Sequence, residues 1–273
     1  MATSFSAREG TIERSGSTIH YWLSGPEGRP LVTLTHGATM DHRMFDAQLP
    51  ALVDEYRVLT WDVRGHGRSQ PIGHDFSMAA AADDLLALIQ LAGYDRAVLA
   101  GQSMGAYIAQ NVVVRYPERA LALVSIGSTN VTRRYSLLDR FGLLLTPPSL
   151  RLWPYENLKR LVARATAISA ETRAYAYEAI SQVSQRDFAN IMAAVAGGLA
   201  YRPDYQIPVP ALLTHGDQDN TGKIKAYARQ WADSQPNARY VVIPNAGHNA
   251  NQDNPDFFNR LLLDFLHQHA PAT

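Results

Sequence analysis

Short apolar runs alternate with segments of helical periodicity along most of the chain. Alternating polar and apolar positions around Ser15 and Gly16 predict an N-terminal hairpin over residues 11–25. Further β-rich runs predict strands at 31–35, 57–62, 97–101, 121–127, 209–215 and 239–244. Helical spacing predicts helices at 41–56, 76–94, 103–118, 223–234 and 254–269. This alternation predicts an α/β fold, in which a mostly parallel β-sheet is sandwiched by helices.

One stretch, residues 131–201, breaks the alternation. It has helical periodicity and no strand-like run, so it predicts an all-helical insertion over one edge of the sheet. The expected division is therefore a core made of residues 1–130 and 202–273, with a helical unit at 131–201. Because open parallel sheets bind ligands at the carboxyl ends of their strands, the loops that follow the strands are where a site is expected.

The composition limits the classes of function. The 273 residues are 46% hydrophobic and carry 25 basic and 25 acidic side chains, so no general attraction to nucleic acid or anionic membranes is expected. Cysteine is absent, which excludes thiol nucleophiles, disulfides and thiolate metal sites. The first residues lack the pattern of a signal peptide, and no run of about 18 apolar residues predicts a membrane span. A cytoplasmic protein is the expectation.

The loop after the strand at 97–101 carries the first candidate for chemistry. It reads Gly101-Gln102-Ser103-Met104-Gly105 and leads directly into a predicted helix. A sharp turn from strand to helix requires very small neighbours and exposes the central serine oxygen above the sheet. A Gly-rich turn in which Ser103 only caps the helix is the alternative.

Histidine and backbone amides complete a possible acyl-transfer site. A serine needs a base, and of nine histidines His248 lies in a loop after a predicted strand and before the last helix. The amide of Met104, which follows the serine, is one candidate oxyanion donor. The loop after strand 31–35 offers the other at Ala38, next to Gly37, while His36 is interpreted as a residue that packs this loop.

Two aspartates compete for the third catalytic position. Asp217 and Asp219 both follow the strand at 209–215, and both could reach a histidine at the same edge of the sheet. Side-chain alternation does not separate them, since positions two apart in an extended chain point the same way. Asp219 could instead cap the next helix, and Asp217 could stabilise the turn after Gly216.

With these motifs, the sequence resembles the α/β-hydrolase family over nearly its whole length. The resemblance rests on HG at 36–37, DVRGHGRS at 62–69, GQSMG at 101–105, HGDQD at 215–219 and AGH at 246–248. The order serine, acid, histidine is the one used by this fold. Among the subgroups of this family, the sequence of residues 36–69 is most similar to that of carboxylesterases and enol-lactone hydrolases.

The resemblance implies a serine hydrolase that cleaves a carboxylic ester or lactone through an acyl-enzyme, without metal or cofactor. The family places its acid three residues after the glycine, which implies the triad Ser103, Asp219 and His248. Many relatives carry a proline shortly after that acid, whereas this chain reads Asn220-Thr221-Gly222. The helical unit at 131–201 stands where the family inserts a cap, and the run at 64–69 corresponds to a structural turn, not to a phosphate loop.

Other reactions remain open from the sequence. The same triad could hydrolyse a carbon–carbon bond or form peracids without a cofactor, and a slow-turnover ligand receptor is a more distant alternative. Ser103 excludes the aspartate nucleophile of the family's dehalogenases and epoxide hydrolases. Apolar and aromatic residues of the cap are expected to pack, and its arginines to form a solvated face. The aromatic and apolar set is Tyr135, Leu138, Phe141, Leu144, Trp153, Tyr175 and Tyr177, and the arginines are Arg133, Arg134, Arg140 and Arg151.

Overall fold

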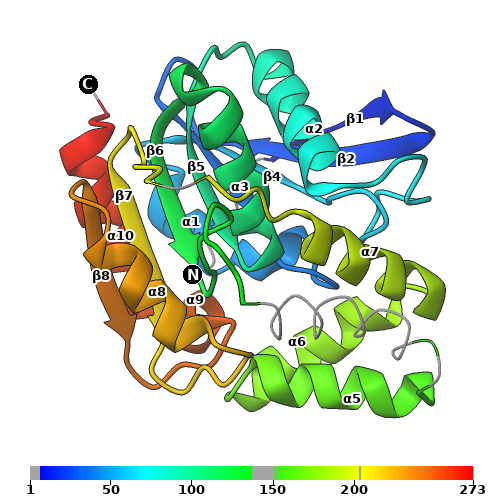
Figure 1. Cartoon of the computed structure of the whole chain (residues 1–273). Coiled ribbons are helices and arrows are strands. Elements are labelled where there is room, and N and C mark those ends of the chain that lie inside the picture. Colours follow the sequence, from blue (N-terminus) through cyan, green and yellow to red (C-terminus); the bar gives the residue numbers. More distant parts are fainter. Residues whose placement is uncertain (1–6, 137–150, 152, 203, 273) are drawn as a thin grey trace.

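The computed structural model describes residues 7–136, 151, 153–202 and 204–272. An eight-stranded sheet runs through the molecule in the order β1-β2-β4-β3-β5-β6-β7-β8 (Figure 1). The first two strands form the predicted hairpin, and β2 also pairs antiparallel with β4. Every other neighbouring pair is parallel. The strands are β1 Arg8–Arg14, β2 Ser17–Ser24, β3 Leu31–Thr35, β4 Arg57–Trp61, β5 Ala97–Gln102, β6 Ala120–Ile126, β7 Ala211–Gly216 and β8 Ala238–Ile243.

Helices cover both faces of this sheet, which confirms the predicted α/β class. One face packs against α2, α3 and α8, and the opposite face packs against η1, α1 and α10. Their bounds are η1 His42–Phe45, α1 Leu49–Leu52, α2 Met78–Leu91, α3 Met104–Arg115, α8 Ile224–Asp233, α9 Ala250–Asp253 and α10 Pro255–His269, with a 3-10 turn η2 at Pro117–Arg119.

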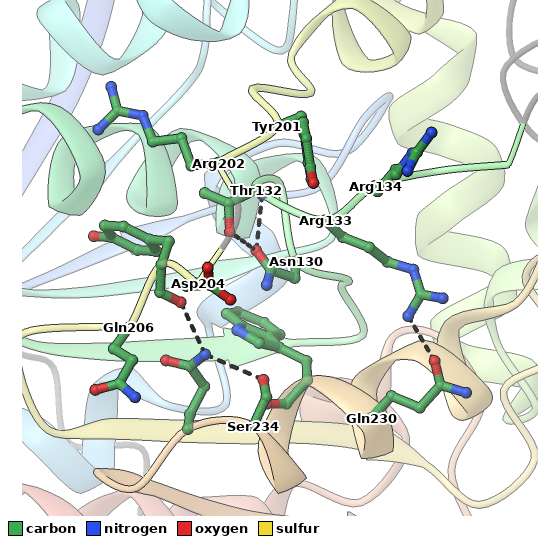
Figure 2. Close-up of a pocket in the computed structure, with 13 residues that line it drawn as sticks. Asn130, Thr132, Arg133, Arg134, Tyr201, Arg202, Asp204, Gln206, Gln230 and Ser234 are labelled. Atoms are coloured by element: carbon green, nitrogen blue, oxygen red, sulfur yellow. Dashed lines mark hydrogen bonds between the residues drawn. The ribbon is translucent and has the colours of Figure 1, made fainter.

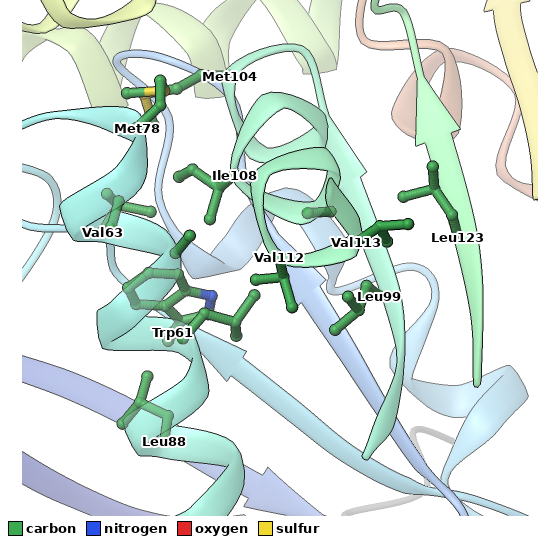
Figure 3. Packing of buried hydrophobic residues seen from close by; sticks show 14 of the residues in the cluster. Trp61, Val63, Met78, Leu88, Leu99, Met104, Ile108, Val112, Val113 and Leu123 are labelled. Atoms are coloured by element: carbon green, nitrogen blue, oxygen red, sulfur yellow. The ribbon is translucent and has the colours of Figure 1, made fainter. Parts of the chain in front are cut away.

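The core follows from strand alternation. Successive residues of β5 point to opposite faces, so Leu99 joins the α2–α3 side while Val98 joins the α10 side. On the α2–α3 side, the Trp61 ring lies among apolar residues of both helices (Figure 3). Its indole N–H donates to Thr35 Oγ1 at 3.0 Å, so the one polar atom of this buried ring is satisfied.

The prediction of one long helix over residues 41–56 was wrong. The structure has the short 3-10 turn η1 and the four-residue helix α1 in its place. Pro50 explains the break, because proline lacks the N–H of a helix interior and fits only the first turn of a new helix. At the start of η1, the His42 amide donates to Asp62, the residue after β4, at 2.7 Å.

Between β6 and β7, the described residues contain three further helices, which are grouped together beside the sheet (Figure 1). They are α5 Tyr155–Thr166, α6 Ala170–Ser181 and α7 Gln185–Gly197, here called the α5–α7 segment. Residues from this segment join both cores, with Phe188 on the α2–α3 side and Ala176 on the α10 side. Of the predicted cap residues, Leu138, Phe141, Leu144 and Arg140 lie outside the described residues.

Candidate active site

Ser103 occupies a strained turn between β5 and α3. Its backbone has φ 50° and ψ −109°, a conformation that residues with a side chain rarely adopt. The Ser103 amide donates to the Ile126 carbonyl on the neighbouring strand at 2.8 Å, which holds the turn in place. The serine side chain makes no capping hydrogen bond to α3, so the capping alternative is not what the structure shows. Ser103 is instead half-buried at the carboxyl end of the sheet.

The two glycines of the motif are needed for close packing. A Cβ at Gly105 would lie 2.0 Å from the Thr35 carbonyl oxygen, and one at Gly101 would lie 2.3 Å from the Gly105 carbonyl carbon. Both obstacles are backbone atoms and cannot move aside as a flexible side chain would. The small residues predicted by the G-x-S-x-G pattern are therefore required by the approach of α3 to β3 and β5.

His248 and Asp219 form a buried hydrogen-bonded pair. His248 Nδ1 lies 2.9 Å from Asp219 Oδ2, and the two residues are 4% and 1% exposed. Burial alone would raise the pKa of Asp219, but the hydrogen bond and charge of His248, with the Thr221 amide, outweigh it and lower that pKa. The carboxylate is therefore ionised and accepts a hydrogen bond from Nδ1–H, which leaves Nε2 as the ring nitrogen that Asp219 does not engage.

Asp217 has a different position. Its side chain is exposed, and its Oδ1 accepts the Ala246 amide at 3.0 Å. This hydrogen bond lowers the pKa of Asp217. Asp217 therefore fastens the loop after β7 to the loop that precedes His248, while Asp219 contacts the imidazole itself.

The serine and histidine loops meet at the end of β6. The Gln102 side-chain amide donates to the His248 carbonyl at 3.0 Å, which links the residue before Ser103 to the histidine. Gly127 packs against the imidazole so closely that a Cβ there would lie 3.1 Å from His248 Nδ1. The structure thus brings Ser103, Asp219 and His248, far apart in sequence, to one edge of the sheet.

The loop after β3 supplies the other predicted amide. A Cβ at Gly37 would lie 2.0 Å from Gln102 Oε1, so this glycine allows the loop to approach the serine turn. Among the hydrogen bonds of the described residues, the amides of Ala38 and Met104 have no acceptor. Donors left in this way at a helix N-terminus and an adjacent loop are suited to binding an oxyanion.

His36 packs this loop, as interpreted from the sequence. It is fully buried, its Nδ1–H donates to the Gly37 carbonyl at 2.8 Å, and its Nε2 accepts the Val63 amide at 2.9 Å. Burial lowers the pKa of His36, so the ring is neutral and both nitrogens are used. It has no nitrogen left to act as a base.

The run at 62–69 is a closed turn around Asp62. That buried carboxylate accepts the His42 amide at 2.7 Å, His42 Nδ1 at 2.8 Å and the Arg68 amide at 2.8 Å. Arg64 is buried against Asp84 at 2.6 Å. The pairing of His42 with Asp62 was not predicted, because no spacing rule connects a residue after β3 with one after β4.

Comparison with known proteins identifies the family. The model of the alpha/beta hydrolase fold family matches residues 30–255. The chain belongs to the α/β-hydrolase fold family. Epoxide hydrolase 3 of Xenopus tropicalis is 26% identical over 93% of this chain and 76% of its own length.

Solved structures agree with this assignment. A thermophilic esterase from Thermogutta terrifontis is 27% identical with a TM-score of 0.77, covering 97% of this α/β-hydrolase and 100% of that chain. The enol-lactonase from Burkholderia xenovorans LB400 is 24% identical with a TM-score of 0.82, covering 94% and 99%. The resemblance to esterases and enol-lactonases is confirmed, and the protein is an enzyme of the hydrolase class.

A separate hollow of about 360 Å³ opens on this α/β-hydrolase where the chain enters and leaves the α5–α7 segment. It is lined by Asn130, by residues 132–134, 201–202 and 204–206, by Gln230 and Trp231 of α8, and by Ser234 and Gln235 just after that helix (Figure 2). The arginines of the hollow fan outward, and Arg133 binds Gln230 Oε1 at 2.6 Å (Figure 2). Arg151 likewise pairs with Asn190 at 3.0 Å. This outward arrangement does not form a convergent anion site.

The described part of this α/β-hydrolase contains no cluster of three or more His, Asp or Glu side chains that could hold a metal ion. No helix among the same residues is both long and apolar enough to cross a membrane.

Proposed function

We propose that this hydrolase cleaves a carboxylic ester or lactone through an acyl-enzyme on Ser103. The observation that carries the proposal is the buried 2.9 Å hydrogen bond from His248 Nδ1 to Asp219, beside the strained turn that carries Ser103. A charged acid on Nδ1 holds the imidazole in the tautomer whose Nε2 can accept the serine proton.

The reaction then follows in two halves. Ser103 Oγ attacks the carbonyl carbon as His248 Nε2 takes its proton, and the carbonyl oxygen becomes an oxyanion. The Ala38 and Met104 amides donate to that oxygen, each donor being worth about 3–4 kcal/mol in comparable enzymes. The protonated imidazole returns the proton to the leaving alkoxide, and the C–O bond breaks. Water, deprotonated by His248, then attacks the acyl-enzyme and frees Ser103.

The comparisons include both epoxide hydrolases and esterases. Ser103 at the nucleophile position favours acyl transfer, because the epoxide hydrolases of this family use an aspartate there. The further division into a core and a cap at residues 131–201 is part of the proposal. Hydrogen bonds from this segment to Asp41, Asn249 and Asp253, beside the site, support a role for it in choosing the substrate.

A substrate panel tests the reaction class. We expect wild-type protein to hydrolyse p-nitrophenyl esters or simple lactones, and Ser103→Ala to lose at least about 10³-fold in kcat. A panel in which only a vinylogous diketone is cleaved, or peracid forms in preference to hydrolysis, would assign one of the other reactions of this triad. Full esterase activity in Ser103→Ala would overturn the proposal.

A further inference from the structure

Asp253 joins the histidine loop to the α5–α7 segment. It is the last residue of α9, five positions after His248, and its Oδ2 accepts the Gly247 amide at 2.9 Å. The same carboxylate accepts the amides of Ile168 and Ser169, each at 3.1 Å, from the connection between α5 and α6. One side chain thus binds the residue before the catalytic histidine and two residues of the helical segment.

The residue after His248 makes a second link to the same connection. The Asn249 amide donates to the Thr166 carbonyl at 2.7 Å. Gly247 lies so close to this connection that a Cβ there would be 3.1 Å from Asp253 Oδ2 and 3.3 Å from the Thr166 carbonyl oxygen. Both neighbours of His248 are therefore tied to the connection at residues 166–169. Gly247 is linked to it through Asp253, and Asn249 is bonded to it directly.

A carboxylate is the side chain that this arrangement requires. Three backbone N–H groups point at its two oxygens, and an ionised carboxylate is an acceptor at both. An amide of the same shape keeps one accepting oxygen and places an NH2 group against at least one N–H donor. Asp253→Asn would therefore release one side of the bridge while changing the volume of the side chain very little.

The α5–α7 segment is also held on the opposite side of the site. Tyr175 of α6 contacts the backbone N and O of Asp41 at 3.1 Å, and Arg43 binds Glu178 of α6 at 2.7 Å. Those contacts anchor α6 beside the loop that carries Ala38. Asp253 is distinct, because its bonds reach the backbone immediately next to His248.

We propose that Asp253 is a positioning residue, which holds His248 in register with Asp219 through the docked connection at residues 166–169. This inference rests on the proposed serine mechanism and adds a way of regulating it. When the connection undocks, the histidine loop loses its bonds on the side facing the α5–α7 segment. Docking of that segment over a substrate and assembly of the catalytic base then become one event.

The test compares Asp253→Asn with Asp256→Asn, which makes the same change at an exposed carboxylate three residues later. We expect Asp253→Asn to reduce kcat for p-nitrophenyl acetate, and the rate of labelling of Ser103 by a fluorophosphonate, by about tenfold or more. The KM for this small ester should change by less than about twofold, and Asp256→Asn should stay within about twofold of wild type throughout. Hydrogen exchange of residues 166–169 and 247–249 should accelerate together in Asp253→Asn.

Each contrary result has a definite meaning. Labelling and kcat of Asp253→Asn equal to those of Asp256→Asn would overturn the positioning role, as would faster exchange at 166–169 without change at 247–249. Failure of wild-type protein to be labelled at Ser103 would overturn the serine mechanism instead. If Asp253→Asn does not fold, wild-type protein decides: the Ser103 phosphonate adduct should slow exchange at 166–169, and no change there overturns the coupling.

Discussion

At the scale of single residues, the two aspartates after β7 differ in burial and therefore in the groups that they contact. Asp219 is almost fully enclosed and contacts His248 Nδ1, whereas Asp217 is exposed and contacts a backbone amide. The sequence placed both in the same loop and could not separate them by alternation. The turn that starts at Gly216 places the two side chains differently. Gly216 lies so close to the loop before His248 that a Cβ on it would be 2.1 Å from the Ala246 carbonyl oxygen.

Substitution of each aspartate by asparagine should separate the roles. We expect Asp219→Asn to lower kcat for a p-nitrophenyl ester by about 10⁴-fold, because the amide can favour the wrong histidine tautomer. Asp217→Asn should lose less than about tenfold in kcat and about 1 kcal/mol or less of unfolding free energy, because its amide oxygen can still accept the Ala246 N–H. Steady-state kinetics and urea unfolding measure both. Equal losses of kcat in the two variants would remove the distinction.

At the scale of elements, the strands and the helices at 76–94, 103–118, 223–234 and 254–269 were predicted nearly as they occur, because their apolar spacing matches the faces they bury. The segment at 41–56 was not, since its apolar residues fit helical spacing while Pro50 divides the backbone. The contacts of Asp253 could not be predicted either, because they join loops 85 residues apart through backbone amides that no side-chain pattern records.

The strand–turn–helix at Ser103 depends on close backbone contact, which glycine substitutions can measure. Gly105→Ala should reduce the unfolding free energy by about 3 kcal/mol, because its Cβ meets the Thr35 backbone at 2.0 Å. Gly197→Ala is the matched control, since nothing lies within 4 Å of its Cβ in α7. We expect that change to be neutral or to stabilise by up to about 1 kcal/mol in urea unfolding. A Gly105→Ala protein as stable as the control would contradict the packing described here.

At the scale of the whole molecule, buried histidines tie folding to pH. His66 is fully buried near His36, and burial lowers its pKa to about 3. In the unfolded chain a histidine binds a proton at about pH 6.5, so between these values the unfolded state holds more protons than the native state. Stability therefore rises with pH across this window and is lost as pH falls. Asp62 and Asp219, whose pKa values are lowered, add to this loss only at more acidic pH.

His66→Gln should weaken the dependence of the unfolding free energy on pH. Between pH 7.5 and pH 5, we expect wild-type protein to lose about 2 kcal/mol more unfolding free energy than the variant. Protonation of His66 in the unfolded chain causes this loss in the wild type, and the variant has no such group. Urea unfolding at both pH values provides the measurement, and His267→Gln, at an exposed histidine of α10, is the control. A His66→Gln protein with the wild-type pH dependence would show that this ring is not held neutral by the fold.

The central claim is that Ser103 is the nucleophile of this α/β-hydrolase. Its most direct test is peptide mass spectrometry after partial inactivation by a fluorophosphonate, with residual hydrolysis of a p-nitrophenyl ester measured on the same samples. We predict that the phosphonyl group lies on Ser103 and that the modified fraction equals the fraction of activity lost. Loss of activity with Ser103 unmodified, or full activity with Ser103 fully modified, would contradict the account.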